Sequence, residues 1–409
     1  MLSRILDLVF RREGGRVLAT LIRQLGDFDL AEDALQDAVA RALERWPAEG
    51  IPDNPGAWLT TVARRRSLDL VRRRKRSAGG DAPEVAVEPE AEDGPATVSG
   101  IEDDRLRLLF TCCHPALAQP AQVALALRTL GGLSTREIAR AYVEPEATTA
   151  QRLVRAKQKI REARIPYEVP RREDLPDRLA AVSEVVYLIF NEGYAAAEAD
   201  SYLRPDLCAE AIRLGRLVVE LLPDEAEPRG LTALMLLHHA RRAARVGADG
   251  GIVPLEEQDR STWDRDEIRE GTAILDGALA LRRPGPYQIQ AAIASLHANA
   301  ATPAETDWPQ IAGLYGALLR HTPSAVVQLN AAVAVAMAGR ISEGLDWVDR
   351  LAASEELRDY HLLPAARADL LRRAGRLAES AGQYRRALEM AKAPAERIYL
   401  ERRLREVTN

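Results

Sequence analysis

The amino-acid sequence predicts an all-α protein of more than one domain. Apolar residues make up 47% of the chain and aromatic residues only 5%, with many alanines, leucines and arginines, a composition that favours packed helices over sheets. At 409 residues the chain is too long for a single hydrophobic core. The first structural expectation is therefore a succession of helical domains.

Charge, cysteine content and hydropathy narrow the class of protein further. The formal net charge of −5 excludes a general polyanion binder, so any contact with DNA must come from local basic patches. Three cysteines, two of them adjacent, cannot form the disulfide framework of a secreted protein. The charged amino-terminal segment does not resemble a signal peptide, and no apolar run approaches the roughly 18 residues of a membrane-spanning helix. These features predict a cytoplasmic protein without a membrane contact.

Two amphipathic helices are expected at the amino terminus. Residues 2–25 alternate Leu, Ile and Val with Arg at helical spacing, and residues 30–46 form a helix that is acidic at its start and basic at its end. Leu35, Val39 and Leu43 repeat every four residues and are expected to form the buried stripe of the second helix. A small acidic surface lies off this stripe and consists of Asp33, Gln36 and Asp37.

A Pro- and Gly-rich loop at 47–57 leads into a third helix, which is expected to begin at Trp58. From Arg64 to Arg76 this helix carries eight positive charges and one negative charge, that of Asp69. Such a run can be a solvated helix face, but beside a loop and a tryptophan it favours contact with nucleic acid. Trp58 itself fits equally well as a core residue at the helix start or as a DNA contact. Residues 77–104 follow as an acidic, flexible linker without helical periodicity.

Residues 121–163 predict a helix-turn-helix. Ser134 precedes Glu137 by three residues, which is the spacing of a capping box, and Pro145 stops the capped helix from running into the next. The second helix of such a pair lies in a DNA major groove, and the alternative is a solvated basic helix within a bundle. Its inward positions are expected to be Leu153, Val154 and Ile160. Its positions for solvent or DNA are expected to be Gln151, Arg152, Arg155, Lys157 and Lys159.

The run Cys112-Cys113-His114 could suggest a metal site. Zinc requires four ligands with gaps such as Cys-x2-Cys, and two adjacent cysteines with one histidine do not supply them. We therefore expect structural packing here, and no metal.

The first 166 residues resemble an extracytoplasmic-function sigma factor of the sigma-70 family. AEDALQDAVARALERWP and NPGAWLTTVARRRSLDLVRRRKR resemble region 2, and LSTREIARAYVEPEATTAQRLVRAKQKIREA resembles region 4. The resemblance implies a region 2 domain at 1–76 and a helix-turn-helix region 4 domain at 105–166, joined by the linker at 77–104. TCCHPAL resembles the opening of region 4 in a subgroup that carries a long C-terminal extension.

This resemblance implies that core RNA polymerase and promoter DNA are the partners. Polymerase docking would then fall to Asp33, Gln36 and Asp37. The loop would capture an unstacked base of the −10 element and the third helix would hold the phosphates of the opened strand, through Asn54, Trp58, Arg64, Arg65, Arg66, Arg72 and Arg73. The helix-turn-helix would contact the −35 element through Arg136, Thr148, Thr149, Gln151, Arg152, Arg155 and Lys159.

Residues 173–409 are expected to form an α-solenoid. AGRISEG at 338–344 and AGRLAES at 374–380 lie 36 residues apart, and Ser380, Tyr384 and Ala387 continue the second copy. This spacing resembles a tetratricopeptide repeat, whose usual period is about 34 residues. In the extended sigma subgroup the added domain is thought to control the sigma module, which implies an intramolecular contact between the two parts.

Two segments, 186–196 and 249–264, do not fit the repeat. The second gathers carboxylates with a glutamine, an arginine and Trp263, which could form a pocket or could be a long loop held by its own polar network. No nucleophile with a paired base, metal cluster or phosphate-cradling glycine loop is visible, so we expect neither a catalytic residue nor a cofactor.

A different class of protein is also compatible with the sequence. A helix-turn-helix regulator could bind duplex DNA and use the helical repeats as its sensor. Residues 30–76 discriminate between the two, since such a regulator needs neither an acidic docking surface nor a base-capturing loop.

Overall fold

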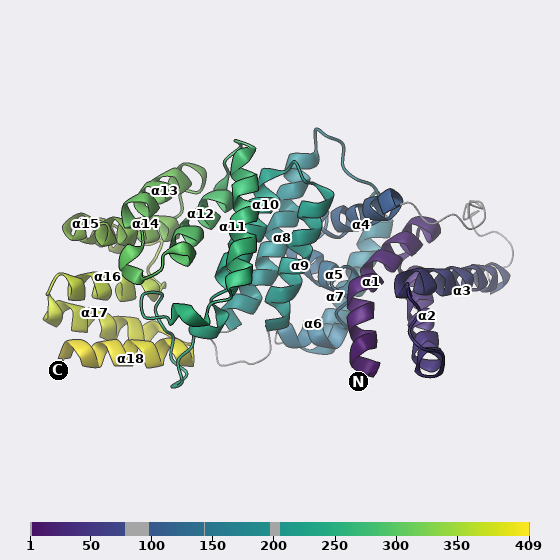
Figure 1. Ribbon diagram of the computed structural model, residues 1–409, viewed down its shortest axis with the longest axis horizontal. Coiled ribbons are helices and arrows are strands. Elements are labelled where there is room, and N and C mark those ends of the chain that lie inside the picture. The colour runs from purple at the N-terminus through teal and green to yellow at the C-terminus, as the bar shows by residue number, and fades with distance from the viewer. Residues whose placement is uncertain (1, 78–97, 143, 197–204, 409) are drawn as a thin grey trace. The chain divides into compact units, whose positions relative to one another are not determined.

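The computed structural model describes residues 2–77, 98–142, 144–196 and 205–408, with the backbone alone at 2–12, 70–77, 98–103, 140–141, 195–196 and 205–206. Its regular elements are helices (Figure 1), and the one extended pairing in the described ranges is an isolated antiparallel bridge between Val246 and Ile252. The all-α prediction is confirmed. The chain forms two compact units, residues 1–188 and 189–409. No helix within the described ranges combines the length and apolar character needed to cross a membrane.

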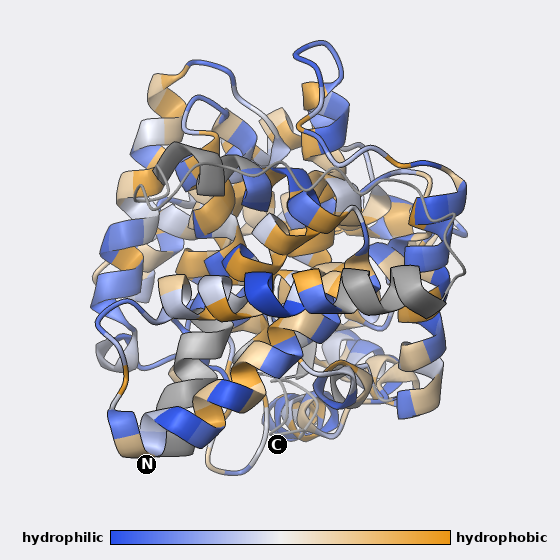
Figure 2. Cartoon of the chain, turned by 90° about the vertical axis from the view of Figure 1, so that its right-hand side faces the viewer, coloured by the Kyte–Doolittle hydropathy of each residue, from blue (hydrophilic) through white to orange (hydrophobic). Residues whose placement is uncertain are grey.

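Unit 1 begins with three helices, α1 (Leu2–Leu25), α2 (Phe28–Glu49) and α3 (Pro55–Ser77). Asp27 caps α2, because its side chain accepts hydrogen bonds from the backbone N–H groups of Asp29 (2.9 Å) and Leu30 (3.1 Å). Polar and apolar residues alternate along single helices in Figure 2, as amphipathic helices require. The buried face of α2 consists of Phe28, Ala31, Ala34, Leu35, Ala38, Ala42 and Trp46.

The predicted stripe of α2 is wrong at Leu43, which is 50% exposed. Four residues rotate a helix by about 400°, so a strict four-residue repeat drifts about 40° per step away from the core. The true stripe mixes steps of three and four residues, and alanines occupy much of it.

Four helices follow in unit 1: α4 (Val98–Cys112), α5 (Gln119–Thr129), α6 (Thr135–Ala141) and α7 (Glu146–Glu162). The first of them begins inside the stretch predicted as linker, and residues 78–97 of that stretch lie outside the described residues. The capping box is confirmed, since the Ser134 backbone N–H donates to Glu137 Oε2 (2.7 Å) and the Glu137 N–H donates to Ser134 Oγ (3.2 Å).

The inward face of α7 differs from the prediction at one position. Leu153 and Ile160 are buried as expected, but Val154 is 61% exposed and Ala156 takes its place. Thr149 is also fully buried, so the stripe runs 149, 153, 156, 160, in steps of four, three and four.

The helix α8 (Leu175–Ala196) contains the boundary between the units. Unit 2 continues with α9 (Pro205–Leu221), α10 (Ala226–His239), α11 (Arg265–Ala280), α12 (Pro286–Asn299), α13 (Trp308–His321), α14 (Ala325–Met337), α15 (Ile341–Ala352), α16 (Leu362–Arg373), α17 (Leu377–Met390) and α18 (Pro394–Thr408). Three single turns, η1 (Arg242–Ala244), η2 (Arg260–Thr262) and η3 (Pro303–Glu305), interrupt the connections.

The 36-residue repeat corresponds to two similar helix hairpins, α14–α15 and α16–α17. Gly339 (φ 91°) and Gly375 (φ 75°) occupy the left-handed region at the same place in each hairpin. After each glycine, a backbone N–H returns to the preceding helix, from Arg340 to Val335 O (3.2 Å) and from Arg376 to Leu371 O (2.9 Å).

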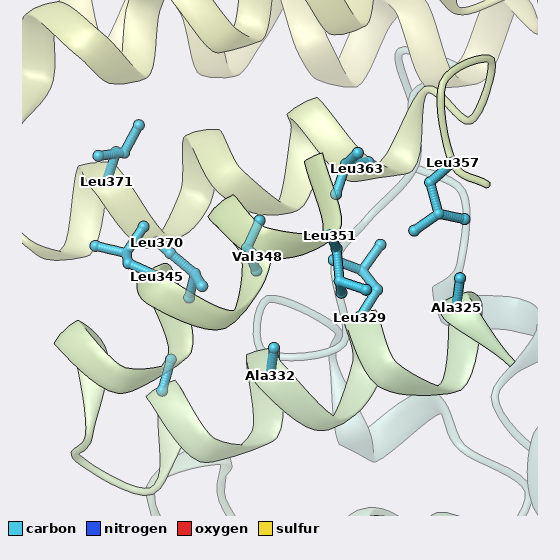
Figure 3. Close-up of a cluster of buried hydrophobic side chains, with 11 residues drawn as sticks. Ala325, Leu329, Ala332, Leu345, Val348, Leu351, Leu357, Leu363, Leu370 and Leu371 are labelled. Carbon is cyan, nitrogen blue, oxygen red and sulfur yellow. The ribbon is translucent and has the colours of Figure 1, made fainter. Parts of the chain in front are cut away.

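Small residues let the two helices of each hairpin approach closely. A Cβ at Gly344 would lie 2.6 Å from the Ala336 side chain, and the equivalent Ser380 is fully buried with its hydroxyl donating to Ala368 O (2.8 Å). Figure 3 shows the core between the hairpins, where alanines and Leu329 of α14 meet Val348 and leucines of α15 and α16. The repeat read from the sequence is therefore a repeat of helix turns and of helix contacts.

Candidate polymerase and nucleic-acid interface

The acidic surface predicted on α2 is present in unit 1. Asp33 and Gln36 are exposed, whereas Asp37 is half-buried and forms an ion pair with Arg66 of α3. Two residues predicted for different partners, polymerase and DNA, thus meet each other in this structure. Asp33 and Gln36 remain free to contact a partner.

The loop before α3 places its predicted DNA contacts in structural roles. Asn54 Oδ1 accepts a hydrogen bond from the Ala57 N–H (3.0 Å), which caps the start of α3. Trp58 is half-buried with its ring edge-on to Trp46, the centroids 5.2 Å apart. On α3, Arg65 is exposed and Arg64 is half-buried, and the side chains of Arg72 and Arg73 lie outside the described residues.

One face of α7 is open to a ligand. Thr148, Gln151, Arg155 and Lys159 are exposed at steps of three and four residues, so they share this face, and Arg136 is exposed on α6. Among the described residues, neither Arg155 nor Lys159 has an acidic partner. This arrangement suits the second helix of a helix-turn-helix that enters a major groove.

Two residues predicted to read bases instead hold the turn between α6 and α7. Arg152 donates from both terminal nitrogens to the two carboxylate oxygens of Glu144 (2.6 Å each), and the buried Thr149 hydroxyl bonds the same carboxylate. The hydrogen bond from Arg152, with that from Thr149, lowers the pKa of Glu144 despite partial burial. The prediction for Thr149 is therefore wrong in this conformation, because position 149 lies on the buried stripe.

The opposite flank of α7 contacts α2, which the sequence did not predict. Lys157 Nζ lies 3.0 Å from Asp29 Oδ1 and 2.8 Å from Glu32 Oε2, and Arg161 lies 3.4 Å from Asp29 Oδ2. The Lys157 side chain is only 11% exposed, so the expectation that it faces solvent or DNA is wrong. Burial alone would lower the pKa of Lys157, but Glu32 and Asp29 outweigh it and raise the pKa.

Further contacts within unit 1 join α1 to the helices after the linker. Arg23 of α1 pairs with Asp104 of α4 (3.0 Å), a carboxylate that is 1% exposed and also paired with Arg107. The Tyr167 hydroxyl donates to Ala19 O (2.9 Å). The two modules predicted from the sequence contact each other directly through Lys157 and α2, and these further bonds tie α1 to the segments that flank the second module. The sequence does not reveal that Asp29 and Glu32 pair with α7, because acidic residues are common in the first turns of any helix.

The Cys112-Cys113-His114 run packs into the interior of unit 1. Both cysteines are fully buried, Cys112 Sγ lies 3.2 Å from Thr129 Oγ1, and burial raises the pKa of the Cys112 thiol to about 12. His114 Nδ1 accepts a hydrogen bond from the Ala116 N–H (3.1 Å). Within the described ranges no group of three potential ligands surrounds a metal-sized space.

In unit 2, the segment 249–264 is fixed by its own charged residues. Glu256 pairs with Arg373 of α16, and Glu257 pairs with Arg402 (2.8 Å) and Arg403 of α18. Asp264 accepts hydrogen bonds from the first turn of α11, and Trp263 is 3% exposed. The segment is thus a loop held by a polar network, and Leu255, Glu256 and Arg260 also contribute to the lining of a pocket.

Unit 1 is a helical domain that combines exposed acidic and amide side chains on α2 with an exposed basic face on α7, the second helix of a capped helix pair. Residues 9–77 match the family model of sigma-70 region 2, and residues 178–279 match a family of unknown function (DUF6596). The chain is 44% identical over 403 residues to the uncharacterized protein R00370 of Rhizobium meliloti (strain 1021). The aligned residues cover 98% of this chain and 95% of that protein.

A shorter similarity is to a curated sigma factor. The chain is 32% identical over 154 residues to the probable ECF RNA polymerase sigma factor SigI of Mycobacterium tuberculosis in two strains, CDC 1551 / Oshkosh and ATCC 25618 / H37Rv. This match covers 36% of the chain and 51% of SigI. The chain therefore contains a sigma-70 region 2 domain followed by a DUF6596 domain, and its partial similarity to an extracytoplasmic-function sigma factor supports a sigma-factor role.

Proposed function

We propose that this protein binds core RNA polymerase, directs it to specific promoters in the cytoplasm, and is controlled by its own C-terminal region. The observation that carries the proposal is the match of residues 9–77 to sigma-70 region 2, in a chain whose α2 presents Asp33 and Gln36 to solvent. The protein itself would catalyse no reaction.

In this function α7 reads the −35 element. Its exposed face supplies an amide at Gln151 and cations at Arg155 and Lys159, which suit base edges and phosphates in a major groove. Arg65 and Arg64 on α3 would hold the phosphates of the opened strand near the −10 element. Asn54 and Trp58 would contact a base only if the capping bond and the ring contact with Trp46 give way.

Control by the C-terminal region rests on how the chain is built. The similarity to R00370 extends over 95% of that protein, so the extension accompanies the sigma module as one polypeptide. A regulator fused to the module it controls acts at a high effective concentration without a separate partner. The intramolecular contact between units belongs to this proposal.

Run-off transcription tests the proposal. Purified protein added to core polymerase should yield transcripts from a cognate promoter, and a chain that lacks residues 189–409 retains all of unit 1 for comparison. A changed transcript yield without unit 2 supports control by the extension, whereas equal yields contradict it. Binding to duplex DNA with no transcripts from either chain would favour a helix-turn-helix regulator instead.

A further inference from the structure

Unit 2 contains a cavity of about 350 Å³ that no part of the proposed function uses. It lies between the segment around Leu255, the start of α13, and helices α14, α16 and α18. These helices follow one another in the green-to-yellow part of Figure 1. The volume falls within the range of about 300–1,000 Å³ typical of small-molecule sites.

The lining of this cavity is largely apolar and incompletely covered. Trp308, Val333, Met337 and Tyr360 are half-buried, and Leu362 is 43% exposed. The neighbouring Leu329, which also contributes to the core in Figure 3, is 3% exposed. A ligand that covers such a surface is stabilised because it removes apolar area from water.

The charged side chains in the lining already have partners. Arg373 bridges the carboxylates of Glu256 and Asp369, and Arg260 donates to the carbonyl oxygens of His297 (2.8 Å) and Ala300 (2.5 Å). Those carbonyls lie at the end of α12, where the helix dipole favours a cation. The charged lining residues are two acids and two arginines, which sum to zero, so the cavity offers no net charge to attract an ion.

Two polar groups in the lining keep their hydrogen-bonding capacity. Among the described residues, neither the His297 imidazole nor the Asn330 side-chain amide has a hydrogen-bond partner. The His297 ring meets Trp308 edge-on, with centroids 5.1 Å apart. Burial, with Arg241 and Arg260 nearby, lowers the pKa of His297 to about 4, so the ring is neutral at pH 7.

We propose that this cavity binds a small, uncharged aromatic molecule with one or two hydrogen-bonding groups. The rings of Trp308 and Tyr360 provide surfaces for an aromatic ligand, and His297 and Asn330 provide one polar contact each. An anion or a cation would lose its hydration without gaining an unpaired counter-charge. The inference concerns binding to unit 2 alone and stands or falls independently of the sigma-factor role.

Fluorescence titration of the full chain tests this site with a defined probe. N-phenyl-1-naphthylamine is an uncharged aromatic molecule whose emission rises in apolar surroundings, and 8-anilinonaphthalene-1-sulfonate adds an anionic group to a similar ring system. We expect saturable binding of the uncharged probe with one site per chain, and at least about tenfold weaker binding of the sulfonate. Binding that does not saturate, or a sulfonate that binds as tightly, would overturn the proposal.

A matched pair of variants locates the binding. Leu362 and Leu377 are the first residues of α16 and α17 and are 43% and 46% exposed, but only Leu362 lines the cavity. An aspartate suits the first turn of a helix, so both Leu362→Asp and Leu377→Asp should fold, as circular dichroism can verify. Leu362→Asp should lower the affinity for the uncharged probe by at least about tenfold, whereas Leu377→Asp should leave that affinity unchanged. Equal affinities for the two variants would exclude this cavity.

The polar contact is tested by His297→Phe, which keeps the ring and removes its nitrogens. A probe that carries a hydroxyl, 1-naphthol, should lose about tenfold in affinity, and naphthalene should lose none. An equal change for both molecules would show that His297 contributes shape alone.

Discussion

Charged residues serve different purposes around α7 in unit 1 and around the segment 249–264 in unit 2. On α7, Lys157 is paired and largely covered, while Arg155 and Lys159 on another face have no acidic partner among the described residues. In unit 2, Glu256 and Glu257 are each paired with an arginine of α16 or α18. Basic or acidic composition is therefore a poor guide to a binding site. A charged side chain is available to a ligand only where no other residue of the protein pairs with it.

The largest effect should come from reversing the charge of an exposed residue on α2 that has no partner within the described residues. We expect Asp33→Arg to abolish co-elution with core RNA polymerase, because a like charge at an interface costs several kcal/mol. Size-exclusion chromatography of the mixture measures this. Asp346→Arg, at an exposed position of α15, should co-elute normally, and an equal loss in both variants would mean that the effect is not specific to α2.

A contrast within α7 sharpens the comparison between free and paired cations. Arg155→Ala should weaken binding of a −35 duplex by roughly 1–3 kcal/mol, or about 5- to 150-fold, with no change in thermal stability. Arg152→Ala should instead lower the unfolding temperature of unit 1, because Glu144 loses its bidentate partner. Fluorescence anisotropy and calorimetry separate the two, and the reverse assignment of effects would refute the division of the helix faces.

The partly buried contact between Lys157 of α7 and the acids of α2 should contribute more stability than an exposed pair. Lys157→Met leaves Asp29 and Glu32 without this cation and should reduce the hydrogen-exchange protection of α2 and α7 by about 2 kcal/mol, between the exposed and buried limits. Arg269→Gln on α11, whose pair with Asp266 is exposed, should change protection by less than about 0.5 kcal/mol. Similar values for both variants would mean that the contact between α7 and α2 is not formed in solution.

The smallest effect concerns pH. The pKa of Glu144 is lower in the folded protein than in the unfolded chain, so its contribution to stability is present above its usual pKa of 4.5 and is lost as the pH falls through the folded value. The difference in unfolding temperature between the wild-type protein and Glu144→Gln should therefore narrow between pH 6 and pH 3. A constant difference over this range would show that the carboxylate contributes no charge-dependent stability.

Local signals in the sequence predict local structure well. The Ser134–Glu137 capping box, the stop at Pro145 and the 36-residue repeat are confirmed because each depends on residues close together in the chain. The exposed face of α7 is as predicted at Gln151, Arg155 and Lys159, since three- and four-residue spacing fixes which positions share a side.

What the sequence does not reveal are contacts between distant residues. Lys157 meets Glu32 across 125 positions, and Arg373 meets Glu256 across 117, and neither pair leaves a periodic pattern. The apolar character of Val154 and Leu43 predicts that they lie in the core, yet alanines fill the buried positions beside them. Small residues give a weak hydropathy signal, so helix faces rich in alanine are easily assigned to the wrong side.

The equivalence of Gly339 with Gly375, and of Gly344 with Ser380, has a consequence for how this extension can evolve. The two hairpins have equivalent turns and equivalent small residues at their helix contacts. Duplication or loss of one 36-residue block would therefore leave the same type of helix next to the same type of helix at the junction. We therefore expect that whole 36-residue blocks can be gained or lost without any change to helices α1–α3 of unit 1.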